Sequence, residues 1–353
     1  VTNLQRAVSS KTSIPALEGI LIRSEENRLI LTAYDLEIGM QTELPAIISA
    51  PGAIILTAKL FAEIVRRSPD EDITIDVDDR NTATITSGVS CFTIIGMDSA
   101  EFPELPKITD ADTIKMPQEL LKSMIRQTLF AVADSTAKPI HQGSLFKIEN
   151  GNLDVVSVDG YRLALRREAI NYANNTEFVV PGKTLIEISK ILSGETEDEV
   201  SIFFTKNHIV FEFDDTVVVS RLIEGEYFRI DQMLSSDYET KIQVNKKELL
   251  DCIDRATLLV KESDKKPIIL SITDDNIELK IQSQIGSMDE EIDINKEGKD
   301  IMIGFNPRFL IDALRVIDDE TVDIYLMNPK APCFIRDEQQ SYIYLILPVN
   351  FMA

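Results

Sequence analysis

The stretch that decides the fold reads Pro181-Gly182-Lys183-Thr184-Leu185-Ile186-Glu187-Ile188-Ser189-Lys190-Ile191-Leu192. On a helical period of about 3.6 residues, Leu185, Ile188 and Leu192 fall on one face. Lys183, Glu187 and Lys190 fall on the opposite face. This pattern predicts an amphipathic helix that packs its apolar side on a core and exposes its charged side.

The same layout recurs twice elsewhere in the chain. Residues 59–66 read KLFAEIVR and residues 308–315 read RFLIDALR, so each copy has a cation, an acid and a second cation at the same offsets. Two further helical stretches, residues 119–128 and 248–256, precede the later copies, and both contain Glu-Leu-Leu near their start. Residues 4–7 resemble the end of such a helix. The chain is therefore predicted to contain three repeats, each with two helices.

The length of the chain agrees with three domains. Dividing 353 residues by three gives about 118 residues for each repeat, within the usual domain size of about 100 to 150 residues. We assign the repeats to residues 1–110, 111–238 and 239–353. The first repeat starts within its first helix, so we expect it to lack the strand that precedes this helix in the other two.

The segments between the helices are predicted to be strands, because they alternate with period two and are bounded by turn signals. The first repeat offers 19–23, 29–33, 36–43, 73–77, 82–86 and 91–96. The second offers 144–148, 153–158, 162–167, 200–204, 209–213 and 217–222, and the third offers 268–273, 277–282, 290–294, 322–326, 333–336 and 342–347. Hairpin connections favour antiparallel pairing. The predicted fold class is therefore α+β, with two helices on one face of antiparallel sheets in each repeat.

The composition fits an intracellular protein. Hydrophobic residues make up 44% of the chain, and Cys91, Cys252 and Cys333 stand far apart. Scattered cysteines argue against a disulfide framework and against a zinc site. The sequence contains neither a signal peptide nor an apolar run long enough to cross a membrane. We therefore expect a cytoplasmic protein with no membrane partner and no bound metal.

The net charge of −23 ordinarily argues against nucleic acid as a partner. The distribution of charge weakens that argument, because acidic residues gather in loops and at strand ends. Cations instead occupy the polar helix faces, at Lys59, Arg66, Lys183, Lys190, Arg308 and Arg315. A mixed-charge face is most often an ordinary solvated helix surface. Equivalent cations in three repeats also fit a shared cationic surface inside an acidic shell, and both interpretations stay open at this point.

Seven short motifs, in this order and spacing, carry a resemblance to a known family. They are SIPAL at 13–17, YDLE at 34–37, AEFP at 100–103, VDGYRLA at 158–164, LIEG at 222–225, IGFN at 303–306 and YLILPV at 344–349. Over essentially its whole length the chain resembles the bacterial sliding clamps, the beta subunits of the replicative DNA polymerase. The resemblance implies a head-to-tail homodimer that forms a six-domain ring around duplex DNA. It also implies a non-catalytic processivity factor of DNA replication that needs no cofactor.

The resemblance further implies a groove for short Gln-Leu-x-Leu-Phe-like peptides of the polymerase catalytic subunit, the clamp loader, other polymerases and repair factors. By position, its lining comprises His141, Gly160, Tyr161, Arg162, Leu163, Phe228, Met233, Leu345, Leu347, Pro348, Val349, Asn350 and Phe351. An apolar patch that accepts leucine and phenylalanine anchors, with Arg162 orienting the peptide, fits this role. His141 stands where the family commonly has leucine, and Phe228 where it has proline, so peptide preference is expected to change. Asp159-Gly160 is also a hairpin signal by itself, which leaves a purely structural role open.

Two further sets of residues follow from the resemblance. Lys11, Lys138 and Lys183 match DNA-facing positions, and helix periodicity extends this set to Arg66, Lys190 and Arg315. Each of them fits an ordinary surface cation equally well. Ring closure is expected to pair Phe92 and Ile94 of one subunit with Leu258 and Leu259 of the next, although buried core positions would explain the same residues.

Catalytic functions find little support in the sequence. The histidines are His141 and His208, and neither has a cysteine or an acid at a metal-ligand spacing. Residues 76–81 lack the central glycine and the terminal glutamate of an EF-hand loop. No phosphate-binding loop and no nucleophile elbow occurs. We therefore favour a DNA-encircling clamp over a protein-interaction scaffold that never holds DNA. A metal-dependent nuclease is the third hypothesis.

Overall fold

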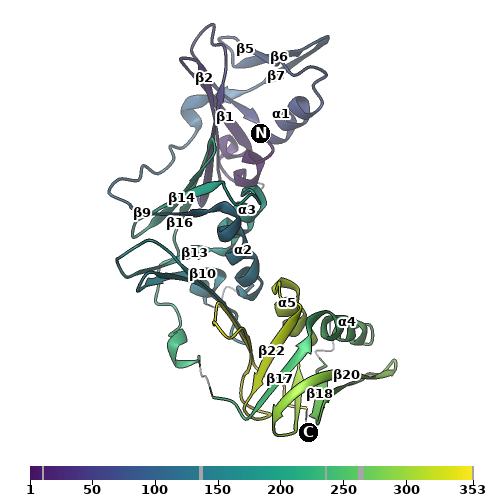
Figure 1. The fold of residues 1–353 in the computed structure, drawn as a ribbon. Helices are drawn as coiled ribbons and strands as arrows, with labels where there is room; N and C mark the ends of the chain where they lie inside the picture. The colour runs from purple at the N-terminus through teal and green to yellow at the C-terminus, as the bar shows by residue number, and fades with distance from the viewer. Residues whose placement is uncertain (10–11, 135–137, 235–236, 261–265, 352–353) are drawn as a thin grey trace. The chain divides into compact units, whose positions relative to one another are not determined.

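The computed structural model describes residues 1–9, 12–134, 138–234, 237–260 and 266–351 (Figure 1). The chain divides into two compact units. Unit 1 comprises Val1–Leu120 and Ile186–Leu222, and unit 2 comprises Leu121–Leu185 and Ile223–Ala353. Each unit is built on one large sheet accompanied by helices, which confirms the predicted α+β class.

Unit 1 contains a nine-stranded sheet with the order β8-β4-β1-β2-β3-β16-β15-β14-β9. Its strands are β1 (Gly19–Glu25), β2 (Arg28–Tyr34), β3 (Ile38–Pro45), β4 (Ala53–Thr57), β8 (Met97–Asp98), β9 (Asp112–Pro117), β14 (Glu199–Phe204), β15 (His208–Phe213) and β16 (Thr216–Arg221). A separate sheet has the order β5-β6-β7, with β5 (Thr74–Val77), β6 (Thr82–Ser87) and β7 (Ser90–Ile95). The predicted alternation is visible in β14, which buries Val200, Ile202 and Phe204 on one face.

Unit 2 contains a twelve-stranded sheet with the order β13-β10-β11-β12-β24-β23-β22-β17-β20-β19-β18-β21. The strands that precede residue 239 are β10 (Gly143–Glu149), β11 (Asn152–Val158), β12 (Arg162–Ala169) and β13 (Thr176–Pro181). The later strands are β17 (Thr240–Asn245), β18 (Ile268–Thr273), β19 (Asn276–Gln282), β20 (Ser287–Gly298), β21 (Ile301–Phe305), β22 (Thr321–Leu326), β23 (Cys333–Arg336) and β24 (Tyr342–Ile346). Neighbouring described strands pair antiparallel in both units, as their hairpin connections require.

Five α-helices lie in the described part of the chain. They are α1 (Ala58–Arg66), α2 (Gln118–Thr128), α3 (Gly182–Ile191), α4 (Lys246–Thr257) and α5 (Pro307–Val316). Shorter 3-10 helices are η1 (Leu4–Ala7), η2 (Pro15–Glu18), η3 (Ser99–Glu101), η4 (Leu129–Ala131), η5 (Pro139–Gln142) and η6 (Ile230–Gln232). None of the described helices is long and apolar enough to cross a membrane.

The amphipathic pattern of residues 181–192 is confirmed. α3 begins at Gly182, directly after β13, and Leu185 and Ile188 are buried on its apolar face; Leu192, directly after the helix, is buried as well. α1 and α5 repeat this arrangement. α5 starts with Pro307 in its first turn, and the side chain of Asn306 caps it by accepting from a backbone nitrogen of the first turn. Residues 4–7, expected as a helix end, form the 3-10 helix η1 instead of an α-helical turn.

The sheets join successive repeats edge to edge. In unit 1, β3 of the first repeat pairs with β16 of the second, and a hydrogen bond of 3.1 Å links the hydroxyl oxygens of Thr42 and Thr216. In unit 2, β12 of the second repeat pairs with β24 of the third, with Leu163 opposite Leu345. Strands of the middle repeat therefore belong to both large sheets. The assigned boundaries at residues 110 and 238 remain predictions.

Candidate functional sites

The β11–β12 hairpin carries the first part of the candidate groove. The carboxylate of Asp159 accepts hydrogen bonds from the backbone nitrogens of Tyr161 (2.9 Å) and Arg162 (3.1 Å). Gly160 has a φ of +93°, which residues with a side chain rarely adopt. The Asp-Gly pair therefore forms a tight turn, and Tyr161 at its tip has 65% of its surface exposed.

An apolar cluster lies beside this hairpin in unit 2. Leu163 of β12 and Leu345 of β24 are buried in it. Met233 and Leu347 are partly buried and pack against it. Its other buried members are Leu145, Val156, Val158, Leu165, Val179, Tyr227, Ile230, Tyr325, Phe334 and Ile343. The structure thus brings four of the expected groove residues together.

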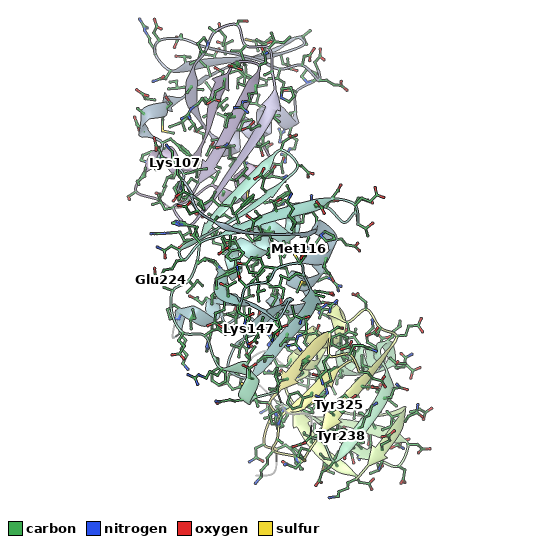
Figure 2. All side chains as sticks on the ribbon, turned by 60° about the vertical axis from the view of Figure 1, so that its left-hand side comes forward. Lys107, Met116, Lys147, Glu224, Tyr238 and Tyr325 are labelled. Carbon is green, nitrogen blue, oxygen red and sulfur yellow. The ribbon has the colours of Figure 1, made fainter. Side chains whose placement is uncertain are left out.

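Aromatic and ionic contacts hold the edges of this cluster in place. Tyr325, labelled beside Tyr238 in Figure 2, lies with its ring centroid 5.1 Å from that of Tyr238 in an edge-to-face arrangement. Lys147 of β10, also labelled there, pairs with Asp231 of η6 at 3.2 Å. Because Met233 directly follows η6, the Lys147–Asp231 pair ties the segment that carries Met233 to the sheet.

His141 and Phe228 are the two positions expected to alter the groove. His141 in η5 is buried, and its ring lies edge-on to Tyr227 with a centroid separation of 5.6 Å. Burial, together with the charge of Lys138, lowers the pKa of His141. The imidazole is therefore neutral near pH 7. Phe228 leaves 46% of its surface exposed, so it offers apolar area that the buried members of the cluster do not.

Arg162 is held by its own chain on every side. Its Nε donates to Asp159 (2.8 Å), its Nη1 to Asp312 of α5 (2.6 Å) and its Nη2 to the carbonyl of Phe130 (2.7 Å). The guanidinium carbon also lies 4.6 Å from the ring centroid of Phe309 and 5.3 Å from that of Phe130. Arg162 therefore connects the hairpin of the second repeat to helix α5 of the third. The sequence did not reveal Asp312 as its partner, since Asp312 sits on a helix face that periodicity alone assigns to solvent.

The segment after β24 divides the remaining groove residues into two groups. The backbone nitrogen of Leu347 donates to the carbonyl of Tyr161 at 2.9 Å, which keeps Leu347 at the hairpin. Two residues later, the nitrogen of Val349 donates to the carbonyl of Gly304 in β21 at 2.8 Å. The ring of Phe351 packs against Gly304, where any side chain would collide with it. Val349 and Phe351 thus lie at β21, whereas Leu347 lies at the apolar cluster beside the hairpin. Pro348 and Asn350 are the residues between these three in the sequence.

The expected DNA-facing cations are exposed but not isolated. Arg66 pairs with Glu63 within α1, and Lys190 pairs with Glu187 within α3 at 2.8 Å. Arg315 of α5 pairs with Asp254 of the adjacent helix α4 at 3.2 Å (Figure 1). Lys183 and Lys138 are exposed as well. Lys11 lies outside the described residues.

The four expected interface residues are distributed between surface and core. β7 pairs only with β6 among the described strands, and its Phe92 is 39% exposed while Ile94 is partly buried. Leu258, just after α4, is 79% exposed. Leu259 packs against the core of the last repeat. An open strand edge and exposed apolar side chains fit a surface that a second molecule covers.

Within the described residues, no group of three or more His, Cys, Asp or Glu side chains is placed to hold a metal ion. Burial and the charge of Arg221 lower the pKa of His208, which lies on β15. His208 belongs to unit 1 and His141 to unit 2.

Protein-family models match the chain in three consecutive segments. The DNA polymerase III beta subunit models match residues 1–106 with the N-terminal domain, residues 115–228 with the central domain and residues 231–350 with the C-terminal domain. These segments follow the order of the three predicted repeats, which confirms a chain of three clamp domains.

Curated proteins and solved structures agree with the family models. The beta sliding clamp of Bacillus subtilis (strain 168) is 34% identical over 364 residues, covering 99% of this chain and 96% of the relative. The beta sliding clamp of Staphylococcus aureus is 33% identical over 357 residues, covering 98% and 94%. The crystal structure of the Bacillus subtilis sliding clamp has a TM-score of 0.96 at 34% identity, covering 99% and 95%. A crystal structure from Eubacterium rectale ATCC 33656, assigned as a DNA polymerase III beta subunit, has a TM-score of 0.96 at 54% identity with the same coverage. This chain belongs to the bacterial DNA polymerase III beta subunit family, the DNA sliding clamps.

Proposed function

We propose that this protein is a processivity factor that closes as a head-to-tail homodimer around duplex DNA and tethers the replicative polymerase. The observation that carries the proposal is the match of all three family domains, in order, over nearly the whole chain. A ring of six such domains holds its partners on DNA by topology and needs no recognition of base sequence. In this proposal the protein works in the cytoplasm, takes no cofactor and catalyses no reaction.

The partner peptide binds beside the β11–β12 hairpin. Met233 and Leu347 are partly buried and Phe228 is exposed, so together they offer apolar surface for a leucine or phenylalanine anchor. The exposed ring of Tyr161 extends this surface at the turn. The polymerase catalytic subunit, the clamp loader, other polymerases and repair factors are the proposed sources of such peptides.

Duplex DNA contacts the exposed cations of the helices. Phosphate contacts supply affinity without sequence information and weaken as the salt concentration rises, which suits a clamp that slides. Arg66, Lys183, Lys190 and Arg315 are exposed on α1, α3 and α5, in support of this role. The net charge of −23 disfavours DNA on the remaining surface.

Retention on DNA separates this proposal from a scaffold that binds only proteins. The dimer is loaded onto closed circular DNA by its cognate clamp loader with ATP, and the products are passed through a gel-filtration column. A clamp co-elutes with the closed circle and is released once the circle is cut. A scaffold elutes apart from both forms of the DNA, which would reject the clamp.

Fluorescence polarisation with a labelled Gln-Leu-x-Leu-Phe-type peptide tests the groove. Replacing both Met233 and Leu347 with alanine should weaken binding at least about tenfold, since truncating a side chain that contacts an anchor costs about 1 kcal/mol or more. Val89→Ala removes a comparable apolar side chain from a fully exposed position in unit 1 and should bind as the wild type does. Equal binding by the wild type, the double variant and Val89→Ala would show that the peptide does not bind at Met233 and Leu347.

A further inference from the structure

One acidic residue recurs at the same offset in the second helix of each repeat: Glu63 in α1, Glu187 in α3 and Asp312 in α5. Two of the three accept a hydrogen bond from an arginine of the preceding repeat. Oε2 of Glu187 accepts from Nη1 of Arg6 at 3.0 Å, and Oδ2 of Asp312 accepts from Nη1 of Arg162 at 2.6 Å. Each junction between successive repeats in this chain thus contains an arginine–carboxylate pair on that helix.

The residue that donates at the first junction has equivalents as well. The ends of the three first helices align so that Arg6, Gln127 and Arg255 occupy one position. Arg6 reaches α3. Gln127 donates to the carbonyl of Val316 (3.3 Å) and to Asp318 (3.2 Å) at the end of α5. Both of them therefore bond to the second helix of the next repeat, or to the residues that directly follow it.

The remaining acid, Glu63, and the remaining donor, Arg255, have partners only within their own repeats in the described part of the chain. Glu63 pairs with Arg66 and with Arg67 (3.0 Å) of its own helix end, where the two arginines are 64% and 75% exposed. Arg255 of α4 donates from Nε to Glu290 of β20 at 3.0 Å and is 51% exposed. Exposed pairs of this kind contribute little stability and are readily exchanged for better partners.

The surfaces around these two residues are complementary in charge. A pocket of about 310 Å³ adjoins Arg255, and its other lining residues are Glu248, Asp251, Glu290, Glu291, Ile292 and Asp293. The end of α1 carries Arg66 and Arg67. An acidic pocket around one arginine therefore faces outward on unit 2, and a basic helix end around one glutamate faces outward on unit 1.

We propose that these surfaces are the two halves of a third junction, in which Arg255 of one subunit pairs with Glu63 of a second copy of this chain. Arg67 of that copy faces the acidic pocket. The inference rests on the proposed head-to-tail dimer, in which the repeat that precedes the first is the last repeat of the other subunit. The inference adds that the Arg255–Glu63 pair joins the two subunits, as the Arg6–Glu187 pair joins two repeats within one chain.

Charge reversal tests this pairing because a head-to-tail dimer contains the junction twice. Glu63→Arg alone places two arginines at both junctions, and Arg255→Glu alone places two glutamates there. Each single variant should raise the dimer Kd, measured by sedimentation velocity or mass photometry, at least about tenfold, since like charges across an interface are strongly unfavourable. An equimolar mixture of the two variants should restore the dimer, because the heterodimer has one original and one reversed pair.

The controls separate this inference from the dimer itself. Glu177→Arg reverses an exposed acid of β13 in the middle repeat and should leave the dimer Kd unchanged. The far-UV circular dichroism spectrum of each single variant must match that of the wild type, so that a lost dimer does not reflect a lost fold. A wild-type dimer that tolerates both reversals, or a mixture no better than the single variants, overturns the pairing and leaves the dimer standing. A wild-type protein that is monomeric at all concentrations overturns the proposed ring and the pairing with it.

Discussion

Replacing Arg162 with alanine should destabilise unit 2 more than any single surface change in the chain. The guanidinium donates hydrogen bonds to two carboxylates and one carbonyl and stacks near two phenyl rings, and its side chain is only 11% exposed. Its removal leaves Asp159, 16% exposed, and Asp312, 35% exposed, without this cation.

The size of the effect follows from these contacts. Removing one member of a buried ion pair costs about 3 to 5 kcal/mol, and the partial exposure of Asp312 places this case near the lower limit. The lost cation–π contacts add about 1 kcal/mol. We expect the free energy of unfolding to fall by about 3 to 4 kcal/mol. Arg162→Lys keeps the charge but not the planar fork, so it should lose about half of that amount.

Urea unfolding followed by circular dichroism measures the change, and hydrogen exchange of the hairpin amides localises it. The matched control is Arg28→Ala, which removes an arginine that also bonds to two carboxylates, Glu25 and Glu43, but at an exposed site. That control should leave the unfolding midpoint unchanged. If Arg162→Ala unfolds no more readily than Arg28→Ala, the structural role assigned to Arg162 is wrong.

Three more predictions concern single positions. Gly160→Ala should destabilise the protein by about 1 to 2 kcal/mol through backbone strain alone, because φ is +93° and the added methyl group meets no atom within 4 Å; urea unfolding measures this. Burial lowers the pKa of His141, so the unfolded chain takes up a proton at higher pH than the folded chain, and stability falls as the pH drops below about 6.5. His141→Leu should lose less stability than the wild type between pH about 7 and about 5. Asp254→Asn frees Arg315 for phosphate, so the slope of log affinity for DNA against log salt should steepen by about 0.9.

Each of these predictions has a specific contrary outcome. A Gly160→Ala protein as stable as the wild type would mean that the turn relaxes to a negative φ. Parallel pH profiles for the wild type and His141→Leu would show that His141 is not buried in solution. An unchanged salt slope for Asp254→Asn would remove Arg315 from the proposed DNA contacts, and Arg315→Ala should then leave the slope unchanged as well.

The repeated helices were predictable because both of their faces are encoded locally. In α3 the apolar residues and the charged residues each recur with the helical period, on opposite faces of the helix. The strands that run directly into helices were harder: β4, β13 and β21 were not predicted, and β9 and β17 were expected before the first helices of the later repeats but without bounds. In β13, for example, Phe178, Val179 and Val180 are all largely buried, so the strand has no period-two alternation and ends without a turn at the first residue of α3.

The β11–β12 hairpin of the candidate site was predictable from its Asp159-Gly160 turn signal. Its long-range contacts were not. Arg162 and Asp312 lie far apart in sequence, and nothing in the pattern of either segment identifies the other. The positions after β24 illustrate a second limit. The sequence does not show that the Phe351 ring packs against Gly304 of β21, where the absence of a side chain leaves room for it. The assignment of Val349 and Phe351 to the groove stays a prediction.

The charged face of α3 also joins two repeats, which neither interpretation of the helix faces included. Burial alone would raise the pKa of Glu187, but hydrogen bonds from Lys190 and Arg6 outweigh it and hold the pKa below its usual value. Glu187 is therefore ionised near pH 7 and holds Arg6 at the junction. Lys190 shares this carboxylate yet keeps 45% of its side chain exposed. The acid in the middle of the face joins repeats, and the cations around it remain at the surface, where an acidic protein needs them if it is to hold DNA.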